Sequence, residues 1–135
     1  MKNADTELRL GAAENAFAQI VWDHAPLSSG DLVKLCREKL EWARSTTYTV
    51  LRRLCDKGLF KAENGTVSAV LSREDYLAVR SESFMESTFS GSLPAFIASF
   101  TAGKKLNREE AEELRRLIEA CTEKEPDPSG KGGRS

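Results

Sequence analysis

Apolar residues recur at helical spacing in several separate stretches of the chain. In the first stretch, residues 12–24, one face of a predicted helix carries Ala13, Ala16, Phe17, Ile20 and Val21. Pro26 follows, and proline cannot continue a helix, so we expect this helix to end at about His24.

A second and a third helix follow closely. The second is predicted to begin at Ser28, because serine caps free backbone N–H groups and Asp31 suits the first turn. After a short connection, the third is predicted from about Arg44 to Lys57, and Gly58 is the expected stop. The inward faces of the two helices are predicted to hold Leu32, Val33, Cys36 and Leu40, and Thr47, Val50, Leu51 and Leu54.

The next segment has the pattern of a β-hairpin. Two short β-prone runs, residues 59–63 and 66–71, flank Asn64 and Gly65. Asn-Gly between such runs favours a type I′ turn, which needs positive φ at both central residues.

Three further helices are predicted in the second half. They cover residues 72–89, 93–103 and 107–121, with caps at Ser72 and Asn107 and a surface pair between Glu112 and Arg116. The tail, residues 124–135, is rich in Gly and Pro and is predicted to be disordered.

These elements predict a mainly α fold with a small β-hairpin. Residues 1–71 form an N-terminal winged helix-turn-helix domain in this interpretation, and residues 72–123 form a C-terminal three-helix dimerisation region.

The outward face of the third helix has the chemistry of a DNA-reading surface. Hydroxyl groups and arginines can bond phosphates or base edges, whereas an ordinary solvated helix carries mostly Glu and Lys. The candidate DNA-binding residues are Arg44, Ser45, Thr46, Tyr48, Thr49, Arg52, Arg53 and Lys57. A solvated surface without a ligand remains the alternative for this face.

The second half has the pattern of a dimer interface. Three short helices would bury large apolar side chains poorly within one chain, so pairing with a second copy is favoured over packing back onto the winged domain. The candidate dimerisation residues are Phe84, Phe89, Leu93, Phe96, Ile97, Phe100, Leu114, Leu117 and Ile118.

The charge distribution supports DNA binding more than the total charge does. The whole chain carries a net charge of −1. Residues 41–61 carry a net charge of +3, whereas the part from Ser72 onward carries −2. A local basic segment is the footprint expected for phosphate contacts.

Other function classes find little support. Cys36, Cys55 and Cys121 are odd in number and widely spaced, and His24 has no ligand partner nearby, so we expect free thiols and no metal or other cofactor. No phosphate loop, nucleophile arrangement or HExxH motif indicates an enzyme. Without an apolar run long enough for a membrane span or signal peptide, we expect a cytoplasmic protein that does not insert into membranes.

Several segments together resemble one known family. They are residues 10–14 followed by Trp22, the segment 42–58, and residues 72–76. The most specific piece is the pattern Thr-x-x-Thr-x-x-x-Arg-Leu-x-x-Lys-Gly, formed by Thr46, Thr49, Arg53, Leu54, Lys57 and Gly58. In order and spacing, these pieces are similar to the BlaI/MecI/CopY family of penicillinase repressors over about residues 10–120.

The resemblance implies a homodimeric repressor that binds a dyad-symmetric operator ahead of resistance genes. It also implies inactivation when a membrane sensor metalloprotease triggers cleavage in the dimerisation region. The family bond precedes a Phe and corresponds here to Ser99–Phe100, although this chain carries Ser99 where the family usually has Asn. Copper sensing is rejected, because Cys121 alone cannot form the cysteine cluster of the copper-responsive branch.

From the resemblance and the helix pattern, we assign phosphate contacts to Arg44, Arg53 and Lys57. Base contacts are assigned to Ser45, Thr46, Tyr48, Thr49 and Arg52. The wing is short and its second strand has no basic residue, so its contacts with phosphate should be weak. The rival interpretation is a winged helix that serves only protein–protein contact.

Overall fold

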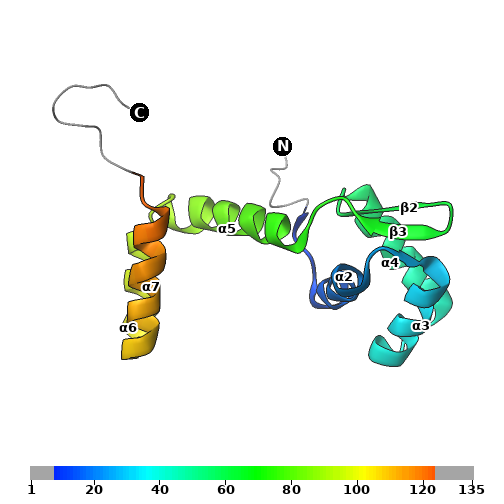
Figure 1. Ribbon diagram of the computed structural model, residues 1–135, viewed down its shortest axis with the longest axis horizontal. Coiled ribbons are helices and arrows are strands. Elements are labelled where there is room, and N and C mark those ends of the chain that lie inside the picture. Colours follow the sequence, from blue (N-terminus) through cyan, green and yellow to red (C-terminus); the bar gives the residue numbers. More distant parts are fainter. Residues whose placement is uncertain (1–7, 124–135) are drawn as a thin grey trace, which may run out of the picture. The chain divides into compact units, whose positions relative to one another are not determined.

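Helices dominate the computed structural model, which describes residues 8–123 (Figure 1). The chain divides into two units between Leu93 and Pro94. The functional boundary predicted between residues 71 and 72 stays a prediction, because the packing of one chain does not show where a dimer interface begins.

The first unit holds a helical winged domain and the helix that follows it. Its elements are α2 (Ala12–His24), β1 (Leu27–Ser28), α3 (Ser29–Leu40), α4 (Arg44–Asp56), β2 (Phe60–Glu63), β3 (Thr66–Ala69) and α5 (Arg73–Phe89). The predicted fold class, mainly α with a winged helix-turn-helix and further helices, is confirmed.

Helix α2 has the predicted bounds but a slightly different buried face. Phe17, Ile20 and Val21 are buried as expected. Ala13 is exposed, and Ala18 is buried in its place. The apolar stripe is therefore rotated toward Ala18, a shift that alanine permits because its small side chain is tolerated on either face.

Helices α3 and α4 pack their predicted inward faces into the core. The Ser28 hydroxyl accepts a hydrogen bond from the Asp31 backbone N–H at 3.0 Å, which confirms the predicted cap of α3. Thr47, Val50, Leu51 and Leu54 are the buried residues of α4. Gly58, with a φ of 92°, directly follows the cap of α4 at Lys57, as predicted.

The wing is larger than the predicted hairpin by one short strand. Strands β2 and β3 pair antiparallel around Asn64 and Gly65, whose φ angles of 53° and 77° are those of the predicted turn. Strand β1 adds to β3 with Leu27 opposite Val67, so the sheet has the order β1-β3-β2. Two residues carry too short a pattern to predict a strand.

The core lies between the helices and the sheet of the winged domain. Its largest fully buried side chains come from α2, α3, α4 and both strands of the hairpin with the residue before it: Phe17, Phe60, Leu32, Leu54, Leu59, Val21 and Val67. Trp42, in the connection before α4, stacks on Phe17 with ring centroids 5.8 Å apart and planes at 13°. This contact fixes the chain just before α4 begins.

The second unit contains α6 (Leu93–Gly103), from Pro94 on, and α7 (Arg108–Cys121). Asn107 caps α7 as predicted by accepting a hydrogen bond from the Glu110 N–H at 2.8 Å. Glu112 pairs with Arg115 at 3.2 Å and not with Arg116 as predicted, since positions three apart on a helix are also neighbours.

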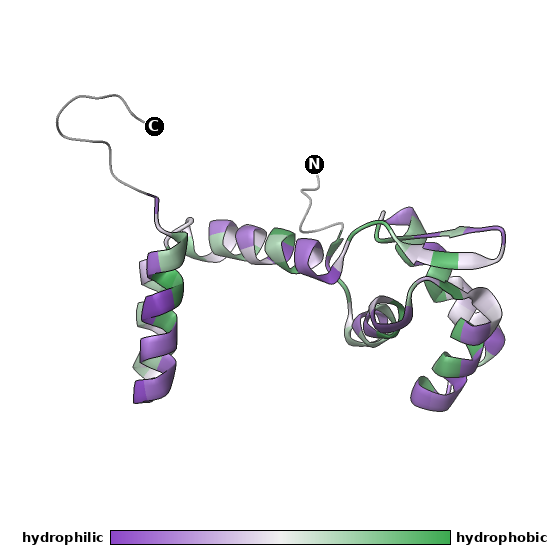
Figure 2. Ribbon diagram, in the orientation of Figure 1, coloured by the Kyte–Doolittle hydropathy of each residue, from purple (hydrophilic) through white to green (hydrophobic). Residues whose placement is uncertain are grey.

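Among the described residues, no side chain of α6 or α7 is fully buried, although Phe96, Ile97 and Leu114 are half-buried. Figure 2 shows hydrophobic and hydrophilic residues interleaved along α7. Among the exposed apolar side chains are Phe100, Leu117 and Ile118, which are 45%, 59% and 49% exposed. The predicted tail, residues 124–135, lies outside the described residues.

Candidate nucleic-acid interface

The candidate site begins with the outward face of α4. Arg44, Ser45, Thr46, Thr49 and Arg52 are exposed and Tyr48 is half-buried. Within residues 8–123, the side chains of Ser45, Thr46, Thr49 and Arg52 have no hydrogen-bond or ion-pair partner in the protein. Their donors and acceptors are therefore available to a ligand.

Arg44 and Tyr48 contact each other on this face. The Arg44 guanidinium carbon lies 5.4 Å from the centre of the Tyr48 ring, one helical turn further along. A cation over an aromatic face is weakly attracted to it, which orients Arg44 while leaving its N–H donors open.

An open trough of about 470 Å³ separates α4 from the wing. Tyr48 and Arg52 line its α4 side, and Lys61 and Glu63 of β2 line the other. Lys61 and Glu63 form an exposed ion pair at 3.7 Å. Because Glu63 offsets the charge of Lys61, weak phosphate binding by the wing stays our prediction.

Cys55 also lines this trough and is half-buried. Burial, together with the negative charge of Asp56, raises the pKa of the Cys55 thiol. Burial likewise raises the pKa of the Cys36 thiol inside the core. Both are free thiols, as predicted, and a raised pKa keeps them in the unreactive protonated form.

Two of the predicted phosphate ligands bind a carboxylate of their own chain. Arg53 Nη1 donates to Glu14 Oε2 at 3.1 Å, and Lys57 Nζ lies 3.6 Å from Glu14 Oε1. Lys57 also donates to the Arg9 carbonyl at 3.1 Å. These contacts join the last turns of α4 to the start of α2.

Glu14 is the residue that sequence reasoning missed. Burial raises the pKa of its carboxyl, but hydrogen bonds from Arg53 and the Gly11 N–H and the charges of Lys57 and Arg53 outweigh that effect and lower it overall. Glu14 lies 39 positions before Arg53, and no periodicity or motif links residues so far apart.

The inward face of α4 anchors the candidate surface. Thr47, a polar residue, is almost fully buried, with 1% exposure. Its hydroxyl donates to the Ala43 carbonyl at 3.4 Å, so the buried oxygen has a partner within the helix. Because Thr47 points into the core, the neighbouring residues Thr46 and Tyr48 point away from the centre of the core.

The predicted dimerisation residues lie on three helices. Phe84 and Phe89 of α5 are in edge contact, with ring centroids 5.9 Å apart. Phe96 and Phe100 of α6 are 6.1 Å apart and line a groove of about 320 Å³ together with Ile97, Leu114 and Leu117. Leu93 and Ile118 are exposed. Phe96, Ile97 and Phe100 of α6 and Leu114 and Leu117 of α7 thus form the apolar part of one groove.

The predicted cleavage site lies inside α6. Ser99 and Phe100 are both exposed and occupy the second half of the helix. Thr101 follows them and donates to the Ile97 carbonyl at 2.7 Å. The bond between Ser99 and Phe100 is therefore held in helical conformation.

The sequence is similar to known proteins over most of its length. Residues 10–120 match the sequence model of the family described as "Penicillinase repressor". The chain is 27% identical to the penicillinase repressor of Bacillus licheniformis over 115 residues, which are 82% of this chain and 90% of that one. It is 23% identical to the penicillinase repressor of Staphylococcus aureus over 125 residues, 90% of this chain and 99% of the relative.

A third relative is the methicillin resistance regulatory protein MecI of Staphylococcus aureus strain Mu50, 23% identical over 81% of this chain and 92% of its own length. Within the described residues, no helix combines the length and the apolar character needed to cross a bilayer.

Proposed function

Because the chain belongs to the penicillinase repressor family, we propose that it is a homodimeric transcriptional repressor of a resistance-type operon. Each protomer places α4 in the major groove of one half of a pseudo-palindromic operator. The observation that carries this proposal is the outward face of α4. Its hydroxyls and Arg52 have no side-chain partners among residues 8–123, while the inward face of the helix is buried.

The polar face of α4 divides by chemistry into two roles. Ser45, Thr46, Tyr48, Thr49 and Arg52 face the bases, where arginine can donate two hydrogen bonds to guanine and threonine methyls contact thymine. Arg44 contacts phosphate directly. Arg53 and Lys57 reach phosphate by exchanging the Glu14 carboxylate for it, so their contribution is smaller than that of an unpaired cation.

Dimerisation supplies the second recognition helix. Two such helices about one duplex turn apart, roughly 34–36 Å, match a two-fold symmetric site. The exposed side chains of Phe100, Leu117 and Ile118 supply apolar area that a second copy would cover. A dimer bound at a promoter excludes polymerase, which is the repression step.

We further propose that a membrane sensor metalloprotease ends repression by triggering cleavage at Ser99–Phe100. A protease binds extended chain, so α6 must open locally before the bond is cut. Co-expression with the sensor and inducer should yield a fragment ending at Ser99, identified by mass spectrometry. A chain that stays intact under those conditions would remove this site from the proposal.

The decisive experiment is a binding titration against promoter DNA from upstream of the protein's own gene. Random DNA of equal length is the control, and two salt concentrations separate phosphate attraction from base reading. We expect tight, promoter-preferring and salt-dependent binding by a dimer. Equal affinity for both DNAs at both salt concentrations would favour the alternative, a winged-helix module for protein–protein contact.

A further inference from the structure

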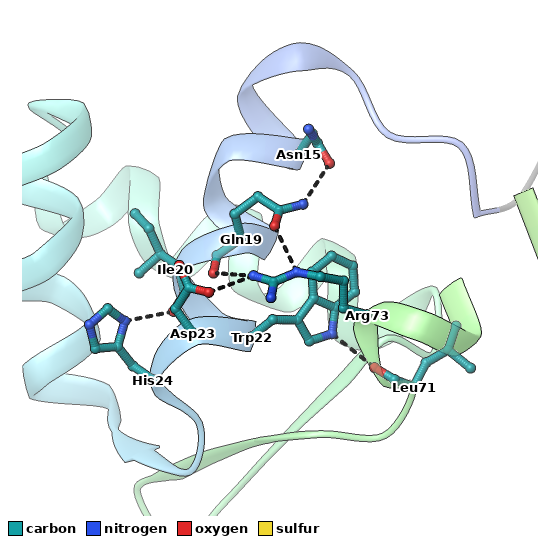
Figure 3. A network of polar contacts seen from close by, with 8 residues as sticks. All are labelled: Asn15, Gln19, Ile20, Trp22, Asp23, His24, Leu71 and Arg73. Atoms are coloured by element: carbon teal, nitrogen blue, oxygen red, sulfur yellow. Dashed lines mark hydrogen bonds and ion pairs between the residues drawn. The ribbon is translucent and has the colours of Figure 1, made fainter. Parts of the chain in front are cut away.

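The first residue of α5 reaches back to the last turns of α2. Arg73 Nη2 lies 2.6 Å from Asp23 Oδ1, and Arg73 Nε donates to Gln19 Oε1 at 2.9 Å. The same Nη2 lies 3.5 Å from the Gln19 carbonyl oxygen. Figure 3 shows the guanidinium between Gln19 and Asp23, with its donors pointing to both.

The Trp22 ring packs against the Arg73 guanidinium. The Arg73 guanidinium carbon lies 5.8 Å from the centre of the Trp22 ring. The indole N–H donates to the Leu71 carbonyl at 2.9 Å, two residues before Arg73 (Figure 3). The Trp22 ring also contacts Tyr76, one turn into α5, at 5.3 Å between centroids. One tryptophan therefore touches the chain on both sides of the start of α5.

The wing holds the same segment from another side. The backbone N–H groups of Val70 and Leu71 both donate to the Leu59 carbonyl, at 2.8 and 3.0 Å. The chain therefore enters α5 from a fixed point, and Arg73 and Trp22 fix its direction. We call the side chains of Gln19, Trp22, Asp23 and Arg73 the α2–α5 junction.

Arginine suits this position because its planar guanidinium presents several donors at fixed angles. It binds two acceptors from successive turns of α2 while stacking on the indole. A lysine could not hold both acceptors and stack at once. The junction takes no part in the DNA contacts proposed for α4, and nothing in that function explains why α5 is tied to α2.

We propose that the α2–α5 junction fixes the direction in which α5 leaves the winged domain, and thereby sets the half-site separation that the dimer accepts. This inference rests on the proposed function. Helix α5 has 17 residues and is therefore about 25 Å long. A tilt of about 10° at its start moves its far end by roughly 4 Å, more than the ~3.4 Å rise of one base pair. A small change in the direction of α5 would therefore let the dimer bind half-sites whose separation differs by one base pair.

The test is a spacer scan on the dyad-symmetric site footprinted in the promoter DNA upstream of the gene. Duplexes with one base pair added or removed at the dyad are compared with the natural spacing and with an isolated half-site. The variants are Arg73→Gln and Asp23→Asn, which change net charge in opposite directions. A non-specific electrostatic effect would shift the affinities of the two variants in opposite directions. A loosened junction would instead reduce, in both variants, the loss of affinity caused by a changed spacer.

We expect the parent protein to lose more than tenfold in affinity when the spacer changes by one base pair. Both variants should lose less than threefold in affinity for the same change of spacer. Their affinity for the isolated half-site and their dimerisation should stay within twofold of the parent. Two results would overturn the inference alone: the full spacer penalty retained in both variants, or a parent that prefers its operator but ignores spacing. A parent without operator preference would overturn the proposed function and this inference with it.

Discussion

Arg53 donates a hydrogen bond to Glu14 across 39 positions of sequence, with 3.1 Å between Nη1 and Oε2. The Glu14 side chain is only 15% exposed, whereas that of Arg53 is 52% exposed. The contact ties the last turns of the proposed recognition helix to the first turn of α2. It therefore helps to hold α4 at the angle at which its free face points away from the domain.

Glu14→Gln should lower the free energy of unfolding by about 1 kcal/mol at neutral pH, because the amide keeps one acceptor oxygen but loses the charge that pairs with Arg53 and Lys57. The pKa of Glu14 is lowered from its ordinary value of 4.5 in the folded protein. Its stabilisation is therefore complete above that pH and is lost as pH falls through the folded pKa. Urea denaturation at about pH 7 and about pH 3 measures this difference.

The matched control is Glu38→Gln, an exposed carboxylate on α3. It should leave the unfolding free energy within about 0.5 kcal/mol of the parent at both pH values. If the Glu14 variant loses as much stability in acid as at neutral pH, the carboxylate charge is not what stabilises the contact.

Arg52→Ala should weaken binding to the operator by about 1–3 kcal/mol and relax the preference at one base pair. Arg52 is exposed on α4 and has no protein partner within residues 8–123. Competition binding against operators mutated at single positions measures this. Arg108→Ala, at the first residue of α7, removes the same charge outside the proposed interface. An unchanged pattern of base preference in Arg52→Ala would exclude Arg52 from base readout.

Lys57→Gln should weaken binding to all DNA sequences alike and make the salt dependence shallower by roughly one unit. The measurement is the slope of log affinity against log salt for operator and random DNA. Arg44→Gln serves as a comparison, since Arg44 has no carboxylate to exchange within the described chain. A parental slope in Lys57→Gln, with a reduced slope in Arg44→Gln, would mean that Lys57 stays with Glu14 in the complex.

Leu117→Asp should shift the protein from dimer to monomer in sedimentation experiments. The side chain is 59% exposed in the single chain, so the change should not disturb a monomer, but it would bury a charge in a dimer interface. Lys105→Asp, in the exposed connection between α6 and α7, is the control and should remain dimeric. A dimeric Leu117→Asp variant would place the interface elsewhere.

Local signals in the sequence predicted most of the fold. The 3.6-residue periodicity identified Thr47 as inward although it is polar, and Asn64 with Gly65 identified the turn of the wing. Capping residues located the starts of α3, α5 and α7. Each of these signals acts over a few neighbouring residues, which is why one sequence suffices to read them.

Contacts between distant residues could not be predicted in the same way. The outward face of α4 follows from its own periodicity, but the partners of Arg53 and Arg73 lie 39 and about 50 positions away. From the sequence alone, many acidic residues could form an ion pair with either arginine. Only the packing of α2 against its neighbours decides that Glu14 and Asp23 are the ones within reach.

The strand β1 changes what the wing can contribute to binding. The Ser29 backbone N–H donates to the Gly65 carbonyl at 2.9 Å, and β1 pairs with β3 up to Thr66, so the tip of the hairpin is held against the start of α3. The conformational entropy of the hairpin is thus already lost when the domain folds. A ligand that touches the wing meets a preorganised surface and incurs little further ordering cost, so even a weak contact there would add to affinity almost undiminished.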